Sequence, residues 1–430
     1  MNRETRAIVG RRVTGLPPFA VPGLVLTFLV LLGCLTAWAS TDVREGTKTA
    51  QRPMFLADWI RLVREHPDSA ALRLSLARAY RRRNRLTDAI FSYSAALHLD
   101  SGLRAAVFER GEVLEELGRW NEAAADFRQG MKSKEYRERS LLGLARVQIA
   151  AGREKEGGET ARRVREEFPE NPVGYSLGGA VALEREEYET AIAFFSKALE
   201  KDSNDLRNVV SRAFALMKAG RFEEADSDFS RLLRNGSDHP LLWLDEGLVL
   251  FHLGRLDEAE RYFRTVLYRR ADTTVILEAE FLLGAVKFLR NDTDALSYLK
   301  GFLSRRGWGA AASPYTATLL YFEYLRVGDE ANANRILHLA LTRLKDRTWP
   351  FPIFGFFAKE ISETDLLRIA GTSDRLTEAL AYVAWFRFLR GDRSGAARLV
   401  RRLEKEGERT MVEYALARRL AERLRRDGKM

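Results

Sequence analysis

Residues 111–127 read GEVLEELGRWNEAAADF, and this stretch decides the fold. Gly111, Gly118, Ala123 and Phe127 mark four positions that recur along the chain at a step of about 34 residues. A fixed repeat of this length in helix-forming sequence indicates stacked pairs of α-helices, in which each pair is one structural unit. The stretch therefore predicts an all-α helix-turn-helix solenoid.

Three of these positions keep the same step over six consecutive units. Small residues occupy the first helix at Ala77, Gly111, Ala145, Gly179, Ala213 and Gly247. Small residues also occupy the second helix at Ala89, Ala123, Gly157, Ala191, Ala225 and Ala259. Four positions further on stand Tyr93, Phe127, Ala161, Phe195, Phe229 and Phe263. The small residues allow the paired helices to approach closely, and the rings fill the gap to the next pair.

The turn between the two helices of a unit also repeats. It reads Gly-Arg at Gly118-Arg119, Gly152-Arg153, Gly220-Arg221 and Gly254-Arg255. Glycine supplies the positive φ angle that ends the first helix. We therefore expect the first helix of these units to end at the glycine.

These columns resemble the tetratricopeptide repeat (TPR) family. Trp243, Gly247, Gly254, Ala259 and Phe263 stand in the order of the TPR consensus, as do the residues of the opening stretch. The resemblance covers residues 67 to 270 well. It implies a surface that binds a protein or peptide partner and that carries no chemistry of its own.

The C-terminal part of the chain, from Trp349 on, carries a narrower resemblance. Trp349-Pro350-x-Pro352-Ile353, Tyr382 and Val412-Glu413-Tyr414 resemble the end of NlpI-type TPR lipoproteins. The chain departs from that pattern at Phe357-Ala358-Lys359, where the family typically has Tyr-Leu-Gly. The resemblance implies an envelope protein that acts as an adaptor for cell-wall enzymes.

An uncharged run extends from Phe19 to Ala39 and is long enough to cross a bilayer. Four arginines precede it, so the positive-inside rule keeps the N-terminus in the cytoplasm. Three interpretations are open: an uncleaved transmembrane helix, a lipoprotein signal acylated at Cys34, and a secretory signal peptide cleaved after Ala39. All three place the repeats on the extracytoplasmic, periplasmic side of a bacterial envelope.

The register divides the chain into five parts. They are a leader with the membrane segment (1–39), a tether (40–53), a capping helix with six regular repeats (54–270), two degenerate helix pairs (271–344) and a proline-interrupted segment with TPR-like helices (345–430). In the last part we expect Thr348–Ile353 to be an extended or turn segment, because two prolines stand close together. Ser362 is expected to cap a short helix that runs to Ala370.

The sequence contains no recognisable catalytic, metal-binding or nucleotide-binding motif. None of the five histidines has a second ligand three or four positions away, and no HExxH or CxxC motif occurs. Residues 307–312 spell G-x-G-x-x-A, but they follow helix-like sequence rather than a strand. We therefore predict no enzymatic activity, no cofactor and no metal. Nucleic acid is a poor candidate partner for an exported protein, although the formal charge is +10.

The inner wall of the solenoid, formed by the first helix of each pair, changes character along the chain. Its inward positions are charged in the first two repeats, for example at Arg78, Arg81, Glu112 and Glu116. They are apolar in repeats four to six, where the predicted peptide groove comprises Leu183, Val210, Phe214, Met217, Leu241, Leu244, Leu248 and Phe251. The alternative is that this wall is covered by the chain's own C-terminal helices or by a second copy.

The function expected from these observations is that of a non-enzymatic, envelope-facing scaffold or adaptor that binds a protein or peptide partner. Two alternatives are open. In the first alternative, the chain acts as an assembly factor for a secretion, pilus or polysaccharide-export machine. In the second, it is a structural protein that self-associates into homo-oligomers.

Overall fold

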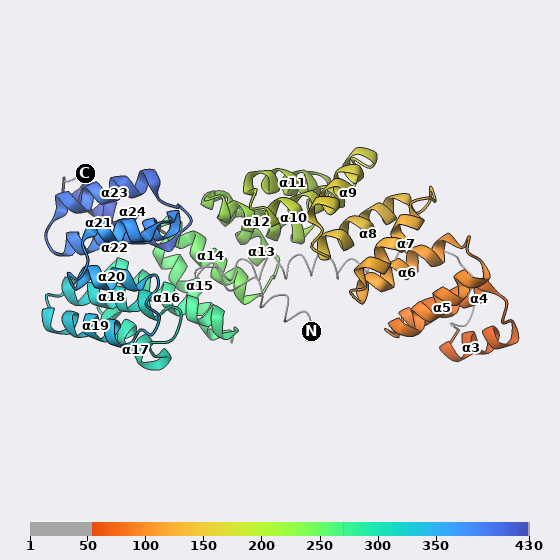
Figure 1. The fold of residues 1–430 in the computed structure, drawn as a ribbon, viewed down its shortest axis with the longest axis horizontal. Helices are drawn as coiled ribbons and strands as arrows, with labels where there is room; N and C mark the ends of the chain where they lie inside the picture. Colours follow the sequence, from red (N-terminus) through yellow and green to blue (C-terminus); the bar gives the residue numbers. More distant parts are fainter. Residues whose placement is uncertain (1–53, 270, 429–430) are drawn as a thin grey trace. The chain divides into compact units, whose positions relative to one another are not determined.

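The structure, a computed structural model, describes residues 54–269 and 271–428. Within these ranges the chain forms 22 α-helices and no β-strand (Figure 1). The predicted all-α fold is therefore confirmed. The helices divide into two compact units, one ending at Ala215 and the other beginning at Leu216.

The predicted leader, the membrane segment with Cys34 and the tether lie outside the described residues. In the described ranges, no helix combines the length and the apolar character that crossing a bilayer requires.

The unit that ends at Ala215 is a regular stack of helix pairs. Each helix packs on the next along the chain from α3 to α11 (Figure 1). The helices are α3 (Leu56–Glu65), α4 (Ala70–Arg81), α5 (Leu86–Leu99), α6 (Arg104–Glu116), α7 (Trp120–Gly130), α8 (Arg137–Ala150), α9 (Glu154–Glu167), α10 (Pro172–Glu184) and α11 (Tyr188–Lys201). The division between the units falls within α12 (Leu206–Lys218).

The unit that begins at Leu216 also starts as a stack of helix pairs. Its helices are α13 (Phe222–Arg234), α14 (Pro240–Leu253), α15 (Leu256–Tyr268), α16 (Thr273–Arg290), α17 (Ala295–Arg306), α18 (Ser313–Arg326), α19 (Glu330–Arg343), α20 (Phe351–Phe357), α21 (Glu363–Ala370), α22 (Ser373–Leu389), α23 (Arg393–Glu406) and α24 (Val412–Arg426). After α19 the helices no longer pack only on their neighbours in the sequence. Helix α22 packs on α18, and α24 packs on α22 and also on α14 and α16. Helices far apart in the sequence therefore lie side by side.

The turn positions have the conformation that the sequence predicts. Gly118, Gly152, Gly220 and Gly254 have φ angles of 72°, 72°, 74° and 81°. In the two repeats without this glycine, Asn84 and Glu186 take the same left-handed conformation, with φ angles of 57° and 59°. The geometry of the turn is therefore kept even where the residue type does not favour it.

The aromatic column contacts the small column of the first helix within the same pair, whereas the sequence predicts rings in the gap to the next pair. A Cβ atom added to Gly111, Gly179 or Gly247 would lie 3.0, 2.7 or 2.6 Å from the ring of a phenylalanine in the second helix of the same pair. Those phenylalanines are Phe127, Phe195 and Phe263, and each is at most 2% exposed. The ring thus occupies the space that the missing side chain leaves.

One local expectation is wrong in part. Thr348 to Pro350 form a turn, as predicted, but α20 begins at Phe351 and contains Pro352 in its first turn. Proline is tolerated there because the first N–H groups of a helix have no partner within the helix. The short helix capped by Ser362 is confirmed, since its Oγ accepts from the Asp365 N–H at 3.1 Å.

Candidate binding surfaces

The eight apolar residues predicted to line a groove lie on α10, α12 and α14, and they belong to both units. Six of them are buried, at 1 to 7% exposure: Leu183, Phe214, Met217, Leu241, Leu244 and Phe251. Val210, in the first unit, and Leu248, in the second, are half-buried. These two residues therefore retain the most surface for contact with a partner.

In the second unit the chain's own last helix, α24, contacts the C-terminal ends of two inner helices, α14 and α16. Arg418 on α24 donates from Nη1 to the His252 carbonyl at 3.4 Å, at the end of α14. Arg423 donates from Nη2 to the Leu289 carbonyl at 2.6 Å, at the end of α16. Its guanidinium also lies 5.2 Å from the centre of the Trp385 ring. The ends of α14 and α16 are thus held by basic side chains of α24.

In the first unit the charged part of the inner wall is joined by ion pairs. Arg81 on α4 pairs with Glu112 and Glu116 on α6, at 2.7 and 2.6 Å. Arg146 on α8 pairs with Glu115 on α6 through Nε at 2.7 Å, and both side chains are 9% exposed. The charged positions therefore link neighbouring repeats. A partner that bound here would have to compete with these internal ion pairs.

A buried pair of carboxyl groups connects α22 and α24. Glu378 is 3% and Glu413 4% exposed, and burial raises the pKa of both carboxyl groups, that of Glu378 to about 9. Trp349 Nε1 donates to Glu378 Oε2 at 2.8 Å, and the Tyr382 hydroxyl donates to Glu413 Oε1 at 2.7 Å. Because both carboxyl groups are enclosed, a substrate cannot reach them in this conformation.

Three further carboxyl groups of the second unit have a raised pKa, and burial raises that of Glu246 to about 8. Burial raises the pKa of Asp245 to about 7 and that of Glu278 to about 8. Burial also lowers the pKa of His252 to about 3. The His252 ring stacks on the Phe222 ring, with 4.3 Å between the ring centres. Among the described residues, no group of three or more His, Cys, Asp or Glu side chains is arranged to hold a metal ion.

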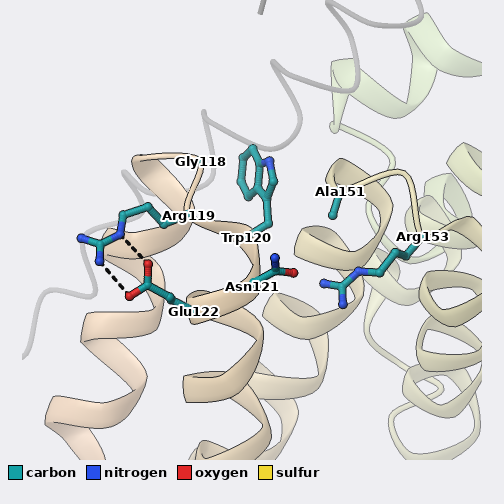
Figure 2. A pocket seen from close by; sticks show the side chains of 7 residues that line it. All are labelled: Gly118, Arg119, Trp120, Asn121, Glu122, Ala151 and Arg153. Carbon is teal, nitrogen blue, oxygen red and sulfur yellow. Dashed lines mark hydrogen bonds and ion pairs between the residues drawn. The ribbon is translucent and has the colours of Figure 1, made fainter. Parts of the chain in front are cut away.

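A pocket of about 380 Å³ lies in the first unit, at the turns that precede α7 and α9. It is lined by Gly118, Arg119, Trp120, Asn121, Glu122, Ala151 and Arg153. Figure 2 shows that the guanidinium of Arg153 and the amide of Asn121 point toward one another, whereas Arg119 points away and pairs with Glu122. We call this the Trp120–Arg153 pocket. None of its lining residues is among the site residues predicted from the sequence.

Of the two arginines that line the pocket, Arg153 differs from the arginines at the corresponding turns. Arg85, Arg119, Arg221 and Arg255 each pair with the acidic residue three positions later, at 2.6 to 2.7 Å. Arg153 lies 3.9 Å from Glu156, and its Nε and Nη2 are buried without a hydrogen-bond acceptor. In the sequence this difference is marked by Gln148. The corresponding residue is a leucine one repeat earlier, at Leu114, and two repeats later, at Leu216.

A comparison with protein families identifies the repeat in part of the chain. The tetratricopeptide repeat model matches residues 56–104, 108–172 and 211–273. These segments contain α3 to α5, most of α6, α7 to α9 and α13 to α15. These three segments therefore match tetratricopeptide repeats, and the described part of the chain is an all-α helical solenoid.

Solved structures with similar repeats include the following three. A tetratricopeptide repeat protein from Parabacteroides merdae ATCC 43184 is 17% identical, with a TM-score of 0.41, and the match covers 52% of this chain and 89% of that one. YrrB, described as a TPR protein with an unusual peptide-binding site, is 18% identical, with a TM-score of 0.31 and coverages of 52% and 97%. MamA from Desulfovibrio magneticus RS-1, from residue 41 to its end, is 17% identical, with a TM-score of 0.36 and coverages of 40% and 97%. No curated protein matches the sequence significantly.

Proposed function

We propose that this chain is a non-enzymatic scaffold that faces the cell envelope and binds a protein or peptide partner on its inner helices. The observation that carries the proposal is the run of tetratricopeptide repeats between residues 56 and 273, because TPR proteins generally mediate protein–protein interactions and bind peptides. The resemblance of the C-terminal part, from Trp349 on, to NlpI-type lipoproteins favours a cell-wall enzyme as the partner class.

Burial narrows the choice of contact residues on the inner helices. A glutamate at Phe214 or Phe251 would bury an unpaired charge and would unfold the repeat, because these side chains are 6% and 1% exposed. Val210 and Leu248 are half-buried, so each accepts a charge at lower cost. We propose that these two residues contact the partner, each within its own unit.

Affinity capture from crosslinked envelopes tests this proposal with the single variants Val210→Glu and Leu248→Glu. We expect capture of the partner to fall about tenfold or more, equivalent to the loss of about 1.4 kcal/mol of binding free energy. Phe91→Glu is the matched control, because Phe91 is 74% exposed and lies on α5, the second helix of its pair. Undiminished capture by both variants, with unchanged helix content in circular dichroism, would overturn the assignment.

The envelope-facing orientation is tested separately. An alkaline phosphatase fusion after residue 53 should be active, because the enzyme matures only outside the cytoplasm, whereas a fusion before Phe19 should be inactive. The mass of the mature chain then distinguishes the three interpretations of the membrane segment. Loss of a lipid mass in Cys34→Ser identifies acylation, cleavage after Ala39 identifies a signal peptide, and an intact N-terminus identifies an anchor.

A further inference from the structure

We propose that the Trp120–Arg153 pocket is a second binding site, which takes the carboxylate of an acidic peptide segment. The site lies at the turns of the first unit and contains none of the predicted groove residues, so it goes beyond the function proposed above. Its ligand chemistry follows from the state of one side chain, the guanidinium of Arg153.

Arg153 makes only a long ion pair in the described structure. The nearest carboxylate oxygen, on Glu156, is 3.9 Å from Nη1, which is too far for a hydrogen bond. Nε and Nη2 are buried without an acceptor, and a buried donor that makes no hydrogen bond is costly. The side chain as a whole is 29% exposed. The proposed site therefore requires the guanidinium to turn toward the pocket, so that Nε and Nη2 meet the ligand. An incoming carboxylate relieves this cost, because the planar guanidinium matches a carboxylate with two parallel hydrogen bonds.

Gln148 explains why Arg153 lacks the partner that the other turn arginines have. Its Nε2 donates to Glu156 Oε2 at 3.2 Å, and its Oε1 accepts from the Thr160 hydroxyl at 2.7 Å. Gln148 is only 4% exposed, so it is fixed in this position. The glutamine therefore holds Glu156 away from Arg153. A leucine at this position, as at Leu114, offers no such donor, and there Arg119 keeps its pair with Glu122.

The remaining walls of the pocket fit a peptide rather than a bare anion. Trp120 and Ala151 provide apolar surface beside the guanidinium, and the Asn121 amide faces Arg153 (Figure 2). Glu122 is the one carboxylate among the lining residues, and Arg119 holds it at 2.8 and 2.7 Å. Its charge is thus compensated. A volume of about 380 Å³ lies within the range of about 300 to 1,000 Å³ that ligand sites occupy.

An array of random hexapeptides tests the proposal with the purified full chain. Each peptide is present with Asp and Glu residues, with Asn and Gln in their place, and with phosphoserine in their place. We expect the chain to retain the acidic peptides, and Arg153→Ala to weaken their binding about tenfold. Gln148→Leu should weaken it as strongly without altering the pocket wall, because Glu156 is then free to pair with Arg153. Arg85→Ala is the control, since Arg85 occupies the same turn position but pairs with Asp88.

Three results would overturn the proposal. They are equal binding of the acidic and amide peptides, retention of phosphopeptides alone, and undiminished binding by Arg153→Ala. If Gln148→Leu proves unstable, Arg153→Lys decides the matter, because lysine keeps the charge and loses the planar fork. Binding of the acidic peptides should then still fall, and full retention by Arg153→Lys would contradict a bidentate site.

Discussion

At the scale of single residues, the repeat register shows which positions are constrained by the backbone and which by packing. The turn position needs a positive φ angle in every repeat, and Glu186 adopts it at 59° although its Cβ disfavours that conformation. Gly152, at the same position one repeat earlier, has a φ angle of 72° with open space around it. The two residues therefore allow backbone strain to be measured without a change in packing.

We predict that Glu186→Gly stabilises the chain by about 0.5–1 kcal/mol, because the strained conformation is relieved. Glu186 is exposed, so the substitution leaves the core unchanged. The converse variant, Gly152→Glu, should destabilise the chain by about 1 kcal/mol. Urea unfolding followed by circular dichroism measures both effects. A lower midpoint for Glu186→Gly would show that the glutamate side chain contributes more than the strain removes.

At the scale of secondary-structure elements, the link between α22 and α24 is the feature that the repeat pattern does not predict. In the sequence, Trp349, Tyr382 and Glu413 stand out only as parts of a family resemblance. In the structure Trp349 donates to Glu378 and Tyr382 donates to Glu413, and Glu378, Tyr382 and Glu413 are all buried. Tyr315 on α18 faces these two carboxyl groups, and Asp374 and Arg375 at the start of α22 act on the charge of Glu378.

We predict that the stability of the second unit falls as the pH rises from about 4.5 to about 9. The pKa of Glu378 is raised to about 9, so the folded chain keeps a proton that the unfolded chain releases near its ordinary value of 4.5. Stability is therefore complete below the unfolded pKa and is lost with rising pH, by up to about 1.4 kcal/mol per pH unit for each proton. Thermal unfolding at a series of pH values measures this slope.

Glu378→Gln provides the matched variant for the pH experiment, because glutamine has nearly the shape of the protonated carboxyl group. Its slope between pH 5 and pH 9 should be shallower than that of the wild type by up to one proton. Glu360→Gln is the control, since Glu360 is exposed. Equal slopes for the wild type and Glu378→Gln would show that the buried carboxyl group is not the source of the dependence.

The sequence predicts most helices of this chain but little of how its last part packs. The register identifies the turns and the core columns, because helix pairs in a solenoid contact their neighbours in sequence. The contacts of Arg418 with His252 and of Arg423 with Leu289 join residues 166 and 134 positions apart, which no short period encodes. The apolar character of the predicted groove residues is evident from the sequence in the same way, but whether each one is buried depends on such distant contacts.

At the scale of the whole molecule, we assign partner binding to the inner helices, with the Trp120–Arg153 pocket as a separate site. Each unit offers one half-buried apolar residue among the predicted groove residues, Val210 in the first and Leu248 in the second. Exposed aromatic residues also occur on second helices, where Phe91 is 74% and Tyr268 87% exposed. Partner binding at these exposed residues of the second helices is the alternative to partner binding on the inner helices.

Hydrogen exchange of the chain with and without its captured partner tests the assignment to the inner helices most directly. We predict slower exchange, on partner binding, in peptides of α12 and α14 that contain Val210 and Leu248. Peptides that contain Phe91 and Tyr268, on α5 and α15, should exchange at an unchanged rate. A complex that protects only the peptides of α5 and α15, and leaves those of α12 and α14 unchanged, would contradict partner binding on the inner helices.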